Sequence, residues 1–185
     1  MTRRPGDVRV LLICGSTRPG SSNLATLRAV TTLDLPGLDA QMYEGLTALP
    51  LFIPEQQSVP PPVRYLLDQI TAADAVLFCT PEYAGGLPGS LKNLLDWTIA
   101  GGELYGKPVA WLDVANPGRG AASHAQLTTV LGYVGARVVA DACAHLPMRR
   151  TPHAVALDAE AVPELQRAMG ALLAAIRGAP ARASE

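Results

Sequence analysis

The stretch GSTRPGSSN, at residues 15–23, gathers polar side chains that could bind an anion. Its serine and threonine hydroxyls and its asparagine amide are hydrogen-bond donors, and the planar guanidinium of Arg18 matches the oxygens of a phosphate. The spacing Gly15-x-x-x-x-Gly20 is that of a nucleoside-triphosphate loop, but Ser21 stands where that loop needs its lysine. The sequence therefore predicts a site for one terminal phosphate, held by neutral donors and a single arginine.

The same residues have a simpler interpretation as the cap of a following helix. Serine and asparagine are preferred at helix N-termini, where their side chains satisfy free backbone N–H groups. Capping explains one such residue, but not the cluster of Ser16, Thr17, Ser21 and Ser22. A helix beginning here would also direct free N–H groups and its positive dipole end at an anion. We therefore favour phosphate binding.

A second loop, TPEYAGGLPG at residues 80–89, is suited to a flat ligand. Pro81 and the pair Gly85-Gly86 bend the backbone and allow close approach, and Tyr83 offers an aromatic face and a hydroxyl. Taken alone, the loop is explained equally well as an ordinary turn from a strand to a helix.

A third loop, ANPGRGA at residues 115–121, would form the far wall of the same crevice. Gly118 and Gly120 expose backbone donors there. Arg119 could reach a phosphate, although a solvated side chain is the simpler interpretation.

Other ionisable residues give weaker signals. His124, His145 and His153 lack the spacing of metal ligands, so we expect them on surfaces or helix caps and predict no metal site. For Glu82 and Lys92, an internal ion pair is the simplest expectation.

Each of the three loops follows an apolar segment predicted to be a buried strand. These strands are VRVLLIC (8–14), AVLFCT (75–80) and PVAWLDVA (108–115), with further candidates at 40–45 and 136–144. Helical segments lie between them, at 22–33, 63–73, 90–100 and 123–135, and a closing helix at 160–177. The alternation predicts an α/β doubly wound three-layer sandwich with a five-stranded parallel sheet, for which we expect the common strand order 2-1-3-4-5. In that order the first two loops meet at the topological switch point, where ligands bind.

Size and composition narrow the class of protein. With 185 residues, one domain at 1–178 followed by a frayed tail at 179–185 is expected. A net charge of -1 lacks the basic footprint of a nucleic-acid-binding protein, and no apolar run approaches the length of a membrane span. The three cysteines, Cys14, Cys79 and Cys143, sit in apolar runs without CxxC spacing. We expect a cytoplasmic protein without disulfides.

Taken together, the first two loops resemble those of the NADPH-dependent FMN reductase family. That family includes flavin, quinone, azo-dye and chromate reductases on a flavodoxin-like fold. The resemblance rests on GSTRPGSSN and TPEYAGGLPGSLKNLLDW, extends to LPLF at 49–52 and to residues 107–139, and covers roughly residues 8–140.

The resemblance implies a set of FMN-binding residues. It places Ser16, Arg18, Ser21, Ser22 and Asn23 around the FMN phosphate, and Pro81, Glu82, Tyr83, Ala84 and Gly85 along the edge of the isoalloxazine ring, with Gly118 closing the other side. Ala84 stands where the family typically has asparagine, which puts flavin affinity, redox tuning or substrate preference at this position in question.

The resemblance also implies an activity. It indicates an FMN-dependent oxidoreductase that passes hydride from NADPH or NADH through flavin N5 to a small-molecule electron acceptor, such as free flavin, a quinone, an azo dye or a metal oxyanion. A flavodoxin-like FMN electron carrier and a non-catalytic flavin-binding protein are the alternatives.

Family members commonly pair through the helices that follow the second and third loops. A homodimer or homotetramer is therefore expected. Contacts could come from Leu91, Leu94, Leu95, Trp97 and Ile99, which could equally belong to the core.

Overall fold

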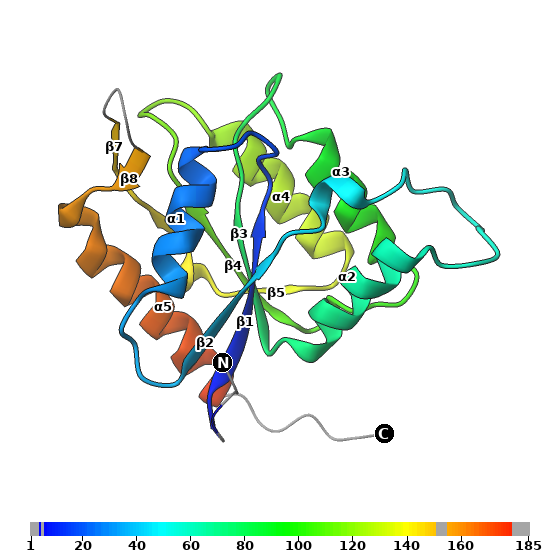
Figure 1. Cartoon of the computed structure of the whole chain (residues 1–185), viewed down its shortest axis with the longest axis horizontal. Helices are drawn as coiled ribbons and strands as arrows, with labels where there is room; N and C mark the ends of the chain where they lie inside the picture. Colours follow the sequence, from blue (N-terminus) through cyan, green and yellow to red (C-terminus); the bar gives the residue numbers. More distant parts are fainter. Residues whose placement is uncertain (1–3, 5, 151–154, 179–185) are drawn as a thin grey trace.

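A parallel β-sheet with helices on both faces forms the framework of the molecule (Figure 1). The computed structural model describes residues 4, 6–150 and 155–178. The strands lie in the order β2-β1-β3-β4-β5, and β6 also pairs with β4. Their bounds are β1 Val8–Cys14, β2 Leu38–Tyr43, β3 Ala75–Cys79, β4 Pro108–Asp113, β5 Arg137–Val138 and β6 Ala144–His145. The predicted fold class and strand order are confirmed.

The central strands are apolar on both faces, because helices cover the sheet from both sides. In β1, Val10 and Leu12 face one core, whereas Leu11 and Ile13 face the other, as the alternation of side chains along a strand requires. Helices α1 (Ser22–Thr31) and α5 (Val162–Arg177) pack on the first face, and α2 (Pro61–Ala72), α3 (Gly89–Trp97) and α4 (Ala121–Tyr133) on the second (Figure 1).

Strands β1 and β3 end in register, and this alignment positions the first and second loops. Their pairing runs from Val10 beside Ala75 to Cys14 beside Cys79. Because the strands are parallel, the loops that follow them leave the sheet from the same edge, which is the upper edge in Figure 1.

The C-terminal third differs from the expectation. The strand predicted at 136–144 is split into β5 and β6 by the 3₁₀ turn Ala140–Ala142, which contains Asp141. A short antiparallel hairpin of β7 (Met148–Arg150) and β8 (Val155–Leu157) occupies a segment whose sequence shows no clear pattern. Two further 3₁₀ turns are at Leu46–Ala48 and Ala159–Ala161.

Two other expectations concern the ends of the chain and the membrane. The tail predicted at 179–185 lies outside the described residues. Across the part of the chain that the structure describes, every helix is too short or too polar to span a bilayer.

Candidate functional site

The three predicted loops meet around a cavity of about 330 Å³ at the carboxyl edge of the sheet. This volume lies at the lower end of the range found for small-molecule sites. The first loop contributes two residues, the second loop three, and Val114 with the third loop the remainder. The lining residues are Ser22, Asn23, Thr80, Pro81, Glu82, Val114, Ala115, Asn116, Arg119 and Gly120.

Gly15 brings the first loop into direct contact with the second. Its N–H donates to the carbonyl of Cys79 at 2.9 Å. A Cβ atom at this position would lie only 2.7 Å from Cβ of Thr80, so any side chain would force the loops apart. Close packing against Thr80 therefore requires glycine at this position.

Helix α1 presents its N-terminus to the cavity. Ser21 is the N-cap, and its hydroxyl accepts a hydrogen bond from the Leu24 N–H at 3.2 Å. The first turn reads SNLA and carries no charge, so the positive end of the helix dipole keeps its attraction for an anion. The capping interpretation and the phosphate interpretation of this stretch are thus compatible.

The predicted phosphate ligands do not all face the same cavity. Ser22 and Asn23 line it, whereas Ser16 lines a neighbouring cavity of about 210 Å³ with Thr17 and Arg28. The Ser16 hydroxyl accepts from the backbone N–H of Arg18 at 3.3 Å, and the Arg18 residue is exposed. Ser21 borders a groove between α1 and the residues Leu157 and Val162.

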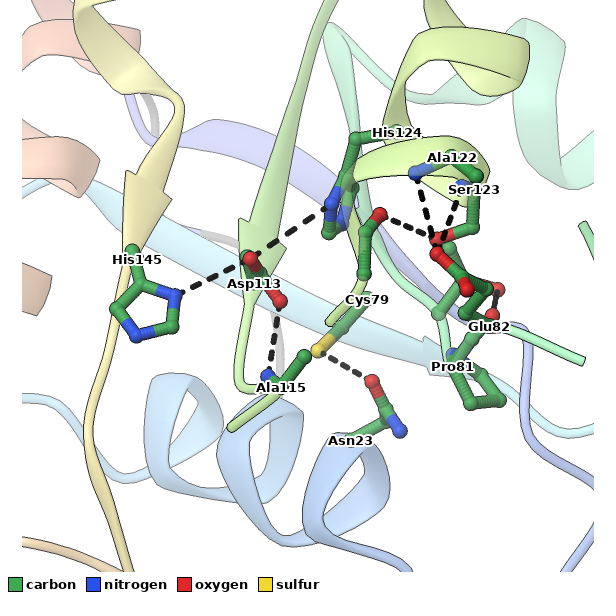
Figure 2. A network of polar contacts seen from close by, with 12 residues as sticks. Asn23, Cys79, Pro81, Glu82, Asp113, Ala115, Ala122, Ser123, His124 and His145 are labelled. Carbon is green, nitrogen blue, oxygen red and sulfur yellow. Dashed lines mark hydrogen bonds and ion pairs between the residues drawn. The ribbon is translucent and has the colours of Figure 1, made fainter. Parts of the chain in front are cut away.

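The Asn23 side chain accepts a hydrogen bond from a buried cysteine. The Cys79 thiol donates to Oδ1 of Asn23 at 3.2 Å, and the Asn23 Nδ2 points away from the sulfur (Figure 2). Burial raises the pKa of the Cys79 thiol well above its usual value, so the group remains a neutral donor. Burial likewise raises the pKa of the Cys14 thiol.

The tip of the second loop is a tight turn from Tyr83 to Gly86. These two residues exchange backbone hydrogen bonds of 3.0 and 3.1 Å. Ala84 and Gly85 between them have φ angles of 50° and 76°. Positive φ at both central positions defines a type I′ turn, which favours Asn-Gly because asparagine tolerates this region better than alanine does.

Glu82 contacts the N-terminus of α4. Its Oε2 accepts hydrogen bonds from the backbone N–H groups of Ala122 at 3.1 Å and Ser123 at 3.4 Å (Figure 2). The expected ion pair between Glu82 and Lys92 is therefore wrong. Lys92 pairs with Asp96 at 2.6 Å, one helical turn further along α3.

A polar cluster around Asp113 was missed by the sequence interpretation. Asp113 accepts a hydrogen bond from the Ala115 N–H at 2.8 Å and lies 3.1 Å from Nδ1 of His145 and 3.7 Å from Nδ1 of His124 (Figure 2). This carboxylate fixes the start of the third loop. The only signal in the sequence is an acidic residue at the end of an otherwise apolar strand.

His124 is buried, contrary to the surface or cap position expected for it. Its ring stacks on Trp111 with centroids 4.4 Å apart, and its Nε2 is buried without a hydrogen-bond partner in the described part of the chain. Burial lowers the pKa of His124, and the neighbouring Asp113 opposes this effect. His145 lies at the surface as expected, and His153 falls outside the described residues.

Gly118 lies at the tip of the third loop. The loop is closed by a hydrogen bond of 3.0 Å from the Arg119 N–H to the Asn116 carbonyl. Gly118 has a φ of 80°, and no described atom lies within 4 Å of a Cβ built on it, so its backbone faces open space.

The sheet order and the position of the loops identify the fold class. A parallel sheet in the order 2-1-3-4-5, with three loops around a cavity at its carboxyl edge, is the flavodoxin-like arrangement. Solved structures agree. The chain is similar to the flavoenzyme NAD(P)H:acceptor oxidoreductase FerB of Paracoccus denitrificans, with a TM-score of 0.74, 26% identity, and coverage of 92% of this chain and 97% of that one. A WrbA-like flavodoxin protein of Agrobacterium tumefaciens shares the fold, with a TM-score of 0.57 at 14% identity, over 92% of this chain and 98% of that one.

The chain belongs to the NADPH-dependent FMN reductase family, whose model matches residues 8–150. It is 40% identical to an NAD(P)H-dependent FMN reductase of Pseudomonas aeruginosa over 65% of this chain. It is 32% identical to a quinone reductase of Escherichia coli over 55% of this chain. The matched segments span 66% and 57% of the lengths of these two relatives.

Proposed function

We propose that this chain is an FMN-dependent oxidoreductase that takes hydride from NAD(P)H and delivers it to a small-molecule acceptor such as a quinone or an azo dye. The single observation that carries the proposal is the cavity where the uncharged N-terminus of α1 meets the second and third loops. Family membership supports the same activity, since relatives are named as FMN, quinone and azo reductases.

The residues around the cavity have the chemistry that FMN needs. Hydroxyls, amides and arginine suit a single phosphate, and open glycine backbone suits the edge of a flat ring. We propose that Ser16, Arg18, Ser21, Ser22 and Asn23 hold the phosphate, and that Pro81, Glu82, Tyr83, Ala84, Gly85 and Gly118 shape the site of the ring.

The two helix N-termini at the crevice have different roles in this proposal. The N-terminus of α4 already binds the Glu82 carboxylate, whereas the first turn of α1 carries no charge. An incoming phosphate would be repelled at α4 and attracted at α1. The helix ends thus orient the cofactor, with its phosphate toward α1.

When bound, FMN supplies the hydride chemistry through its N5 atom. The protein contributes binding and orientation. Tyr83 is 48% exposed at the tip of its turn, so its ring can contact the nicotinamide or the acceptor.

The proposal is tested by titrating the purified protein with FMN and then mixing the complex with NADPH or NADH in a stopped-flow instrument. We expect saturable binding, bleaching of the flavin by the nicotinamide, and reoxidation by a quinone or an azo dye. Arg18→Ala should weaken FMN binding more than it slows flavin reduction in saturated enzyme.

Other outcomes identify the alternatives. FMN binding without reduction by either nicotinamide would indicate an electron carrier or a non-catalytic flavin protein. If no flavin bound, the proposed function would be wrong.

We also propose that the chain forms homodimers or homotetramers through the α3 and α4 side. Leu91, Leu94, Leu95 and Trp97 are buried in the core, so they cannot supply the contact. Ile99 and Tyr133 remain available, at 59% and 89% exposure. Sedimentation at micromolar concentration should detect an oligomer that Tyr133→Glu weakens, and a monomeric wild type would refute this proposal.

The cytoplasm is the proposed compartment. Cys14 and Cys79 lie side by side in the sheet as free thiols, which is typical of a reducing environment.

A further inference from the structure

We propose that Glu82 and Gln126 are positioning residues that clamp the turn Tyr83–Gly86 onto helix α4. The inference rests on the proposed function, because this turn belongs to the segment assigned to the flavin ring. It changes the role expected for Glu82, whose carboxylate would act on the cofactor through the turn and not by touching the ring.

Helix α4 requires a cap from outside its own sequence. Its N-cap position is Gly120, with a φ of 90°, which has no side chain to satisfy the first N–H groups. A Cβ atom there would lie 2.9 Å from Cβ of Ala115 and 3.1 Å from Oδ1 of Asp113, so a local capping side chain does not fit. Glu82 supplies the missing acceptor from 40 residues earlier in the chain.

Gln126 makes a second contact between helix α4 and the loop. Its Oε1 accepts a hydrogen bond of 2.6 Å from the backbone N–H of Leu87, the residue directly after the turn. Gly86 permits this approach, because a Cβ atom there would lie 2.7 Å from the same oxygen. Gln126 follows Ala122 by four residues, so both contacts fall on one face of α4.

The two contacts hold the turn on both sides. Glu82 precedes the turn and Leu87 follows it, and each is bonded to α4. The turn itself contains Ala84 in the left-handed region, a conformation that alanine rarely adopts unaided. We infer that α4 sets the geometry of the turn before any flavin binds.

The first experiment measures the dissociation constant of FMN by quenching of its fluorescence. Glu82→Ala should weaken binding about fivefold, because the released turn must then be ordered when FMN binds, at a cost similar to that of one helix cap. Glu82→Gln should recover most of the affinity, because its amide oxygen can accept from the same N–H groups. Gln126→Ala should resemble Glu82→Ala, and Gln126→Glu should again recover the affinity.

A matched control is Glu164→Gln, which removes a carboxylate from the first turn of α5, where it pairs with Arg167. It should leave FMN affinity unchanged. If Glu82→Gln bound FMN as weakly as Glu82→Ala, the charge of Glu82 would act directly on the flavin. The proposed clamp would then be overturned. Wild-type affinity in Glu82→Ala would overturn it as well.

The second experiment needs no flavin. Amide hydrogen exchange of the flavin-free protein should become faster at Ala122 and Ser123 in Glu82→Ala, and also at Leu87 if the clamp opens as one unit. Unchanged exchange at Leu87 would overturn the coupling. Should the wild type fail to bind FMN, the proposed function falls, and the exchange data still decide whether the clamp exists.

Discussion

Ala84 adopts a backbone conformation that its side chain disfavours, as Glu55 also does with a φ of 59°. The Ala84 φ of 50° lies in the left-handed region, which costs alanine about 1 kcal/mol or more. Asparagine, expected here from the family resemblance, is the residue that a type I′ turn favours. The backbone alone would therefore favour asparagine at this position, without any contact with flavin.

We predict that Ala84→Asn stabilises the protein by about 0.5–1 kcal/mol, because asparagine tolerates this backbone conformation better than alanine. Urea denaturation measures the change in the free energy of unfolding. Ala84→Val provides the opposite case, since a β-branched side chain is least suited to positive φ and should destabilise. Equal stability of the two variants would contradict the assignment of the strain to this residue.

The burial of His124 predicts that the stability of the folded protein depends on pH. Burial lowers its folded-state pKa below the usual 6.5, so at acid pH the unfolded chain binds this proton more readily than the folded chain. Its contribution to stability is therefore complete above pH 6.5 and is lost progressively as the pH falls below that value. The ionisable groups facing it are Asp113, Glu82 and His145.

His124→Phe tests this, because phenylalanine can keep the stacking on Trp111 but cannot take up a proton. The stability of the wild type should decline more steeply than that of the variant between about pH 6.5 and pH 5, as measured by urea unfolding at each pH. Parallel profiles would mean that His124 does not titrate in this range.

At the scale of elements, the contact between the ends of β1 and β3 determines the shape of the crevice. Gly15→Ala should destabilise by about 2 kcal/mol, because its Cβ would overlap the Thr80 side chain. Gly89→Ala is the matched control. Gly89 begins α3, no described atom lies within 4 Å of its added Cβ, and the change should stay within about 0.5 kcal/mol. Urea denaturation of both variants measures the difference, and equal effects would contradict the close-packing argument.

Elements with a strong local pattern were predicted well. The strands β1 and β3 were recognised because an uninterrupted apolar run is typical of a strand buried on both faces. The pattern of residues 136–144 predicts one strand, but Asp141 lies in a 3₁₀ turn that divides it. The hairpin of β7 and β8 was missed, because short strands carry little periodicity of their own.

At the scale of the whole molecule, ligand binding should couple to global stability. FMN at one hundred times its dissociation constant should raise the free energy of unfolding by about 2.7 kcal/mol. Riboflavin at the same concentration should stabilise much less, because it lacks the phosphate that the N-terminus of α1 is proposed to bind. Thermal unfolding with each flavin makes the comparison, and equal stabilisation would contradict the phosphate assignment.

The fold class and the three loops that surround the cavity are predicted from local signals in the sequence: apolar runs, helical spacing, and glycine-rich turns between them. The family is indicated by the resemblance of the first two loops to its motifs. The contacts of the side chains in those loops are visible only in the folded molecule. The contacts of Glu82 with α4, Gln126 with Leu87, and Asp113 with two histidines join residues far apart in the chain. Such contacts produce no recognisable pattern in a single sequence, because they form only when the folded sheet brings its loops to one edge.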